Sequence, residues 1–284
     1  MIIITLISIV IFIFIFIYFF IKYENFNNYN NIYFFTKNET NKFIIGDKDN
    51  YIKNLTELDL YARKVRNSRE YIDNILKTTV DFTEDEKKKL TKCAIASDNF
   101  LKNCSLYKNT INYNDIINIK WIFACTDNYE NFQYEEGLPH TRENIIFLTK
   151  NIITNNEDNL INTLIHEKIH IYQRYNKNIF DKLNNINGFV KINYNNKYIR
   201  SNPDTTNDIY LDTNTNNVMV CLYRNTTPFG INDVIMKNYS LEHPYEKYAY
   251  EIANYYYSNN KYISVWFFIY IFYIKTYYRV FYIK

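Results

Sequence analysis

The most informative segment of the chain is Leu164-Ile165-His166-Glu167-Lys168-Ile169-His170. Its two histidines, four residues apart, lie one turn apart on one face of a helix, so both imidazoles can point at one metal ion. Glu167 lies where a general base must be to take a proton from a water on that metal. The chain has only 4 histidines in 284 residues, so this spacing arises rarely by chance. The stretch therefore predicts His166 and His170 as zinc ligands and Glu167 as a catalytic base.

The residues around this motif are typical of a helix. Apolar residues recur at helical spacing, and neither Gly nor Pro interrupts residues 157–175. We call this predicted element the zinc helix. The alternative interpretation is an amphipathic core helix whose two histidines are satisfied by hydrogen bonds.

A second motif, residues 242–251, offers a third metal ligand. Catalytic zinc sites generally use three protein ligands plus water. Pro244 begins a helix, and Glu246 in its first turn shares a face with two alanines, so this face can approach the zinc helix closely. Glu246 is the predicted ligand and Glu242 the alternative. Glu251 is a poor substitute, because it lies about 140° around the helix from Glu246.

A catalytic site of this kind also needs a donor for the negative charge that develops on the substrate oxygen. His243, Tyr248 and Tyr250 are the available candidates, and of these we take His243 and Tyr250 as catalytic candidates. The alternative for His243 is an ordinary turn residue before Pro244.

These motifs resemble those of the zincin metallopeptidases, and the second is similar to the glutamate-bearing helix of the gluzincin-like subgroup. The segments LPHTR, LIHEKIHIYQR, NPD and EHPYEKYAYEIA are also similar to zincin-type proteins encoded by large DNA viruses. The resemblance covers residues 115–256. The interval between the motifs is longer than in well-known gluzincins, and we interpret residues 184–217 as an insertion that covers the cleft.

The resemblance implies an α+β fold. We expect a mostly helical zincin-like domain with a small mixed sheet, in which the zinc helix packs against the helix that carries the third ligand. A strand just ahead of the zinc helix would be the sheet edge that binds extended substrate through backbone hydrogen bonds. His140 and Arg142 either line that cleft or are loop residues with local hydrogen bonds.

The resemblance also implies a zinc metallopeptidase that cleaves peptide or protein substrates. A hydrolase for other substrates shares the same motif. The alternative from another class is a membrane-anchored surface or interaction protein with a structural or degenerate zinc site. Glu167 favours catalysis, because a structural site needs no ionisable group there and is closed by a fourth protein ligand.

The two ends differ from the middle of the chain. Residues 2–20 are apolar except for Thr5 and Ser8, and at about 1.5 Å per residue they are long enough to cross a membrane core of ~30 Å. No basic start or small-x-small cleavage site accompanies them, which favours an uncleaved transmembrane anchor over residues 1–22. A buried core helix is the alternative.

We expect a polar tether at 23–50, the metallopeptidase domain at 51–260 and an aromatic-basic tail at 261–284. The side of the membrane that the domain faces stays open.

Charge and cysteine usage narrow the partners. The net charge of +3, from 33 basic and 30 acidic residues, is too small to indicate a nucleic-acid partner. The 4 cysteines form no C-x-x-C pair, which argues against a cysteine zinc site. Free buried thiols are favoured over a bridge between Cys93 and Cys104.

Periodicity predicts the remaining elements. One helix presents an inner stripe from Leu58 to Leu76, and another begins with a capping box at Thr83 and Glu86. A shorter helix is expected around residues 179–183. Short β-branched and aromatic runs predict strands at 119–125, 145–148 and 218–223.

Overall fold

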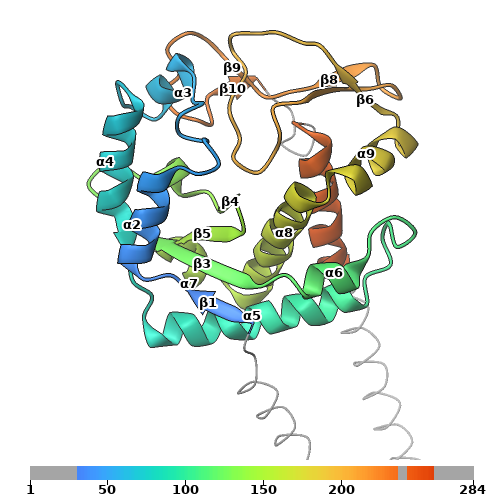
Figure 1. Ribbon diagram of the computed structural model, residues 1–284, viewed down its shortest axis with the longest axis horizontal. Helices are drawn as coiled ribbons and strands as arrows, with labels where there is room; N and C mark the ends of the chain where they lie inside the picture. The colour runs from blue at the N-terminus through green and yellow to red at the C-terminus, as the bar shows by residue number, and fades with distance from the viewer. Residues whose placement is uncertain (1–30, 236–241, 259–284) are drawn as a thin grey trace, which may run out of the picture.

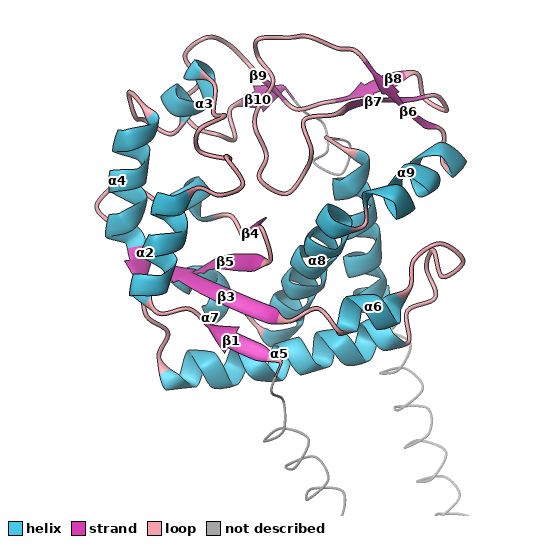
Figure 2. Ribbon diagram, viewed as in Figure 1, coloured by secondary structure: helices cyan, strands magenta, loops and turns pink. Residues whose placement is uncertain are grey.

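The computed structural model of the protein describes residues 31–235 and 242–258. The predicted anchor and aromatic-basic tail lie outside the described residues. Within those residues, no helix is long and apolar enough to span a membrane. The described part is α+β, with a small mixed sheet enclosed by helices (Figures 1 and 2).

The main sheet is built around β3 (Trp121–Thr126). On one side β3 pairs in parallel with β1 (Ile32–Phe34), and on the other with β5 (Ile145–Thr149). The edge strand β4 (His140–Arg142) runs antiparallel to β5, and the short β2 (Thr79–Val80) pairs antiparallel with the end of β3. The strands predicted at 119–125 and 145–148 are therefore confirmed. The strand just ahead of the zinc helix, β5, is not the predicted sheet edge, because it lies between β3 and β4; the edge on that side is β4.

Helices cover both faces of this sheet, which explains why β3 and β5 are continuous apolar runs. Trp121 and Phe123 pack into a core shared with α5 (Glu84–Lys102) and α8 (Glu157–Tyr175). Ala124 packs on the other face, against α2 (Lys37–Gly46) and α4 (Ser68–Thr78). The zinc helix predicted at 157–175 is α8, and it lies directly against the sheet (Figure 1).

Two predicted segments are different in the structure. The tether expected at 23–50 contains β1 and α2, and α2 begins with a capping box at Thr36 and Glu39. The single helix expected from Leu58 to Leu76 is two helices, α3 (Glu57–Ala62) and α4. The break has a local cause: Lys64 is left-handed at φ 59°, and the Asn67 side chain caps the first turn of α4.

Residues 187–235 form strands and loops on one side of the sheet. Here β6 (Phe189–Ile192), β7 (Ile209–Asp212) and β8 (Asn217–Met219) form one sheet, and β9 (Leu222–Tyr223) pairs with β10 (Val234–Ile235). The strand predicted at 218–223 is thus split between two sheets. The shorter helix predicted around 179–183 is α9 (Lys177–Ile186). The other short elements are α6 (Tyr113–Ile117), α7 (Lys150–Thr154) and the 3-10 turn η1 (Tyr134–Gly137).

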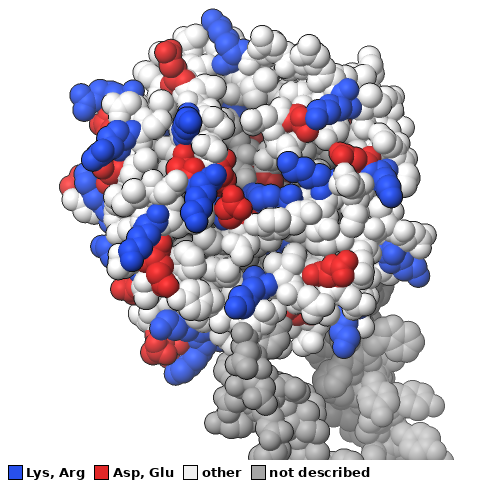
Figure 3. Space-filling view, in the orientation of Figure 1, with Lys and Arg blue, Asp and Glu red and all other residues white. Residues whose placement is uncertain are grey.

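The four cysteines are all buried and free, as predicted. Burial raises the pKa of the Cys125 thiol to about 12, so it is an unreactive core residue. On the face in Figure 3, acidic and basic side chains are interspersed, in keeping with their near balance in the sequence.

Candidate metal centre

His166 and His170 lie one turn apart on α8, as their spacing predicts. Their Nε2 atoms are 2.9 Å apart, and His170 is completely buried. The helix is fixed at its start by the Asn156 side chain, which accepts the Asn159 N–H at 2.9 Å. Both imidazoles therefore point to one place from a rigid element.

Gln173 determines which nitrogen of His170 faces that place. The Gln173 side-chain N–H donates to the carbonyl of Tyr245 at 2.9 Å, so its oxygen is free to accept a hydrogen bond. That oxygen lies 2.8 Å from His170 Nδ1, which must carry the proton. Nε2 is then left with a lone pair, as a metal ligand requires.

Glu246 reaches the same place from another helix, which spans residues 244–258 and is called here the Glu246 helix. Its Oε2 lies 3.4 Å from His166 Nε2 and 3.6 Å from His170 Nε2. Its Oε1 accepts a hydrogen bond from the Asn202 side chain at 2.8 Å. Burial raises the pKa of Glu246, but the two histidines more than offset this and hold it well below its usual value. Asn202 thus orients an ionised carboxylate with one oxygen toward the histidines.

These three residues fit a zinc ion. Their ligand atoms all lie within 4.8 Å of one another. Around a tetrahedral zinc with bonds of about 2.0–2.1 Å, ligand atoms are separated by roughly 3.3 Å, close to the separations given above. Two imidazoles and one carboxylate are typical zinc donors. Among the described residues no fourth His, Cys, Asp or Glu joins the cluster, so one coordination position is left for water or substrate.

Glu167 lies beside the cluster without belonging to it. It is only 3% exposed, and its Oε2 has no hydrogen-bond partner in the described part of the chain. Burial, together with the charges of Asp204 and Glu246, raises its pKa well above the usual value for a carboxyl group. A carboxylate with a raised pKa is a good proton acceptor, because it holds the transferred proton more firmly.

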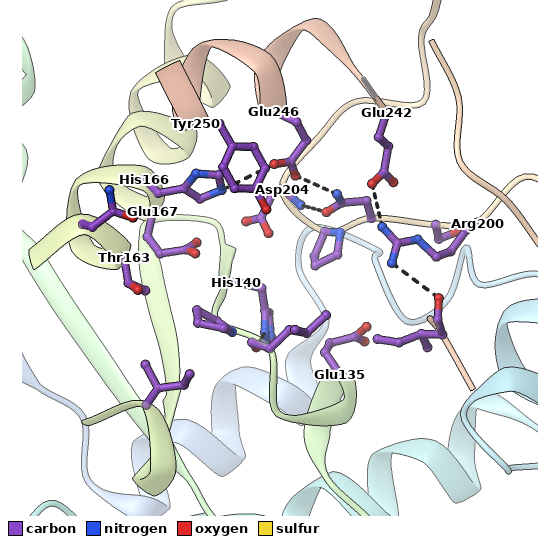
Figure 4. A pocket seen from close by; sticks show the side chains of 18 residues that line it. Glu135, His140, Thr163, His166, Glu167, Arg200, Asp204, Glu242, Glu246 and Tyr250 are labelled. Carbon is purple, nitrogen blue, oxygen red and sulfur yellow. Dashed lines mark hydrogen bonds and ion pairs between the residues drawn. The ribbon is translucent and has the colours of Figure 1, made fainter. Parts of the chain in front are cut away.

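The cluster opens into a pocket with a volume of about 290 Å³ (Figure 4). Tyr250 forms part of its wall, and its ring centre lies 4.5 Å from that of His166. Burial raises the pKa of the Tyr250 hydroxyl, which therefore stays protonated and can donate. Arg200 lies across the pocket, paired with Glu242 at 2.6 Å.

His243 lies away from this pocket, contrary to its predicted catalytic place. Its Nδ1 accepts the N–H of Tyr245 at 3.0 Å, so it caps the Glu246 helix that begins at Pro244. Burial lowers its pKa to about 3, and the ring packs between Tyr210 and Tyr245. The residue before a helix-starting proline is a capping position, which accounts for this role.

The remaining candidates, Glu251, Tyr248 and Glu242, do not reach the His166, His170 and Glu246 cluster as ligands or donors. The Glu251 side chain bonds to Tyr107 and Lys247, away from the cluster. Tyr248 is fully buried, with its ring against those of Tyr107 and Phe180. Glu242 reaches the pocket but is held by Arg200.

The two residues of the LPHTR segment have different roles. His140 lines the pocket, donates from Nδ1 to the Leu138 carbonyl at 3.0 Å and stacks on Phe147. Arg142 is completely buried and pairs with Asp47, at 2.6 Å, and with Asp49. Arg142 therefore anchors the segment after α2 and does not line the cleft.

Several residues of the site carry no local signal in the sequence. The NPD segment is part of the resemblance, but its residues have no predicted role, yet Asn202 holds Glu246 and Asp204 lines the pocket. Glu135 also lines the pocket, from three consecutive left-handed residues: Glu135 at φ 46°, Glu136 at φ 52° and Gly137 at φ 81°. Such strained backbone is common at functional sites. An observable hint is the glycine in this turn.

Comparison with protein-family models, with curated proteins and with solved structures finds no match for this chain.

Proposed function

We propose that the protein is a zinc-dependent hydrolase, and specifically a metallopeptidase. One observation carries the proposal: His166, His170 and Glu246 converge from two helices, and Glu167 lies beside them in a pocket with an unpartnered oxygen. That arrangement matches a catalytic zinc site with three protein ligands and a separate general base.

His166, His170 and Glu246 would hold the zinc. Bound there, the ion would lower the pKa of a water molecule and polarise the carbonyl of the substrate. Glu167 would take the proton of the attacking water and deliver it to the leaving amine. Tyr250 would donate a hydrogen bond to the carbonyl oxygen as charge develops on it.

The geometry favours this function over an interaction protein with a structural zinc site. A structural site is closed by a fourth protein ligand, and the described residues supply three. A structural site also has no use for a buried carboxyl group with an unpartnered oxygen, because burying such an oxygen costs folding free energy.

The proposal includes attachment to a membrane through residues 2–20, which rests on the sequence alone. The full chain is then expected to stay with membranes during alkaline extraction. A soluble chain that begins near residue 23 in cells would instead indicate a cleaved signal.

The test of the proposed activity is a measurement of zinc content together with cleavage of a peptide library, for the wild type and for Glu167→Gln. The amide keeps the shape of the side chain but cannot accept the proton. We expect zinc to stay stoichiometric and turnover to fall by about 10²–10⁴-fold.

Glu251→Gln is the matched control, because Glu251 lies on the Glu246 helix with its side chain away from the cluster. This variant should keep both zinc and turnover. If wild-type protein binds zinc and cleaves no peptide, the metallopeptidase proposal is wrong.

A further inference from the structure

A sheet edge beside a peptidase site can bind an extended substrate through backbone hydrogen bonds. The strand in that position is β4, one edge of the main sheet, and His140 on β4 lines the pocket. Whether an extended peptide can bind there depends on the outward-facing backbone groups of β4.

Those groups are already occupied. Because β4 has three residues and pairs with β5, only the middle residue, Thr141, turns its backbone groups outward. The Thr141 N–H and hydroxyl both donate to Asp204 Oδ1, each at 2.6 Å. The Thr141 carbonyl accepts from Arg174 of α8 at 3.3 Å. We call this set of contacts between Thr141, Asp204 and Arg174 the clasp.

The loop that carries Asp204, residues 200–206, is fixed to three other parts of the fold. Ser201 donates to the buried Asp59 from both its N–H, at 2.9 Å, and its hydroxyl, at 2.8 Å. Asn202 donates to Glu246, and Arg174 donates to the Pro203 carbonyl at 2.8 Å. These contacts hold the loop in place, and its residues 200–204 line one wall of the pocket (Figure 4).

The pocket behind this wall is small. Its volume of about 290 Å³ is at the lower end of the range for ligand sites, roughly 300–1,000 Å³. A space of this size suits a short ligand, and the clasp occupies the backbone N–H and carbonyl of Thr141 with which an extended chain would pair.

We infer that the clasp restricts the site to short substrates, peptides of two or three residues or the end of a chain, and excludes peptides bound as an added strand. This inference rests on the proposed peptidase function and specifies its substrate class. Asp204 and Arg174 then determine specificity for substrate length, and neither transfers a proton in the chemical step.

The test uses the full-length, zinc-loaded protein and a series of peptides from tripeptide to decapeptide with the same cleavable pair at the centre. For the wild type we expect kcat/KM for the decapeptide to be about tenfold or more below that for the tripeptide. The double variant Pro203→Gly/Asp204→Gly frees the Thr141 N–H and loosens the loop. A long peptide could then form one backbone hydrogen bond with Thr141, worth about 1 kcal/mol. We expect this to reduce the difference in kcat/KM between tripeptide and decapeptide by about fivefold.

Asp204→Asn is the matched control, because its amide oxygen still accepts from Thr141 while its charge is gone. In this variant, the ratio of kcat/KM for the decapeptide to that for the tripeptide should equal the wild-type ratio, even if both values change. Arg174→Gln, which releases the carbonyls of Thr141 and Pro203, should narrow the ratio and provides a second variant if the double one is unstable.

A wild-type kcat/KM that stays level or rises with peptide length overturns the inference and leaves the peptidase function standing. So does an unchanged ratio in both opened variants. Zinc-loaded protein that cleaves no peptide of any length overturns the peptidase function, and the inference with it.

Discussion

At the scale of single residues, the site depends on which oxygen or nitrogen each side chain turns toward the metal centre. Gln173 sets the tautomer of His170, and Asn202 holds the outer oxygen of Glu246. Removing outer partners of this kind typically weakens metal binding by about 10–100-fold. The three ligands therefore work as part of a larger hydrogen-bonded set.

Glu246→Gln is predicted to lose zinc and activity together, because a neutral amide is a poorer ligand than a carboxylate. We expect zinc affinity, measured by competition with a chelator, to fall by at least about tenfold. Glu251→Gln, on the same helix, should leave affinity unchanged. Loss of zinc in Glu251→Gln and not in Glu246→Gln would mean that the third ligand is on the other face of the helix.

Glu135 predicts a pH-dependent contribution to stability. Burial alone would raise its pKa, but the charge and hydrogen bonds of Arg63, at 2.6 Å, bring it down to about 2. Because the folded-state pKa is below the ordinary value, the contribution is complete above pH 4.5 and is lost as the pH falls through 2. The difference corresponds to about 3 kcal/mol of unfolding free energy.

Glu135→Gln should therefore lower the unfolding free energy by about 3 kcal/mol at pH 7, since it leaves the Arg63 charge buried beside a neutral group. At pH 3 the gap between wild type and variant should shrink by about 2 kcal/mol. Urea unfolding at both pH values measures this. The exposed Glu84→Gln should stay within about 0.5 kcal/mol of wild type at pH 7. A gap that does not change with pH would rule out ionisation of Glu135 as its cause.

At the scale of elements, local patterns predict what lies within one helix or strand. The i, i+4 histidines are such a case, because helix geometry alone brings them together. The capping box at Thr83 likewise predicts the start of α5. The same locality explains two wrong predictions. The segment predicted as a polar tether contains β1 and α2, and the apolar stripe predicted as a single helix belongs to α3 and α4.

The role of α2 gives a direct test of that correction. Ile44 and Ile45 are neighbours on α2, but Ile44 is 0% exposed and Ile45 is 60% exposed. Ile44→Ala should reduce the unfolding free energy by about 2–5 kcal/mol, because it opens a cavity in the core. Ile45→Ala should change it by no more than about 0.5 kcal/mol. If denaturant titrations show that both variants leave the unfolding free energy unchanged, α2 does not pack in the core and residues 23–50 are a tether.

Behind the metal centre, a buried ion pair joins three elements. Lys168 of α8 lies 2.6 Å from Asp98 of α5, and Asp98 accepts from the indole N–H of Trp121 on β3 at 2.9 Å. Lys168 also lies over the Trp121 ring, 4.0 Å from its centre. A lysine inside the metal motif gives no sign of such burial in the sequence, because its partners are about 50 and 70 positions away in the chain.

At the scale of the whole molecule, the candidate site is a meeting point of distant segments. The His-Glu-x-x-His motif predicted α8, its histidines and Glu167, and the proline-led motif predicted Glu246. The clasp and the loop of residues 200–206 could not be predicted, because their contacts join residues about 30 to 140 positions apart and leave no periodic pattern. His243 is a different case, because its capping role is local: its Nδ1 accepts the N–H of Tyr245 at the start of the helix.

Because the ligands come from α8 and the Glu246 helix, zinc is expected to stabilise the whole fold. Without the ion, the buried Nε2 of His170 and the carboxylate of Glu246 remain together at a cost in desolvation. With free zinc about 1,000-fold above its Kd, binding adds about 4 kcal/mol to the unfolding free energy. For a chain of this size, that corresponds to a rise in Tm of roughly ten degrees.

Calorimetry with and without EDTA measures this shift. Zinc added after EDTA should restore the Tm, and magnesium should not, because it prefers oxygen ligands in octahedral geometry. His170→Ala should melt at the same temperature with and without EDTA, since it lacks a ligand from the rigid core of the site. A wild-type Tm that changes with neither EDTA nor added zinc would show that no metal binds. His166, His170 and Glu246 would then be held by hydrogen bonds alone, as in a core helix without metal. In that case zinc does not bind between α8 and the Glu246 helix, and the proposal of zinc-dependent hydrolysis is wrong.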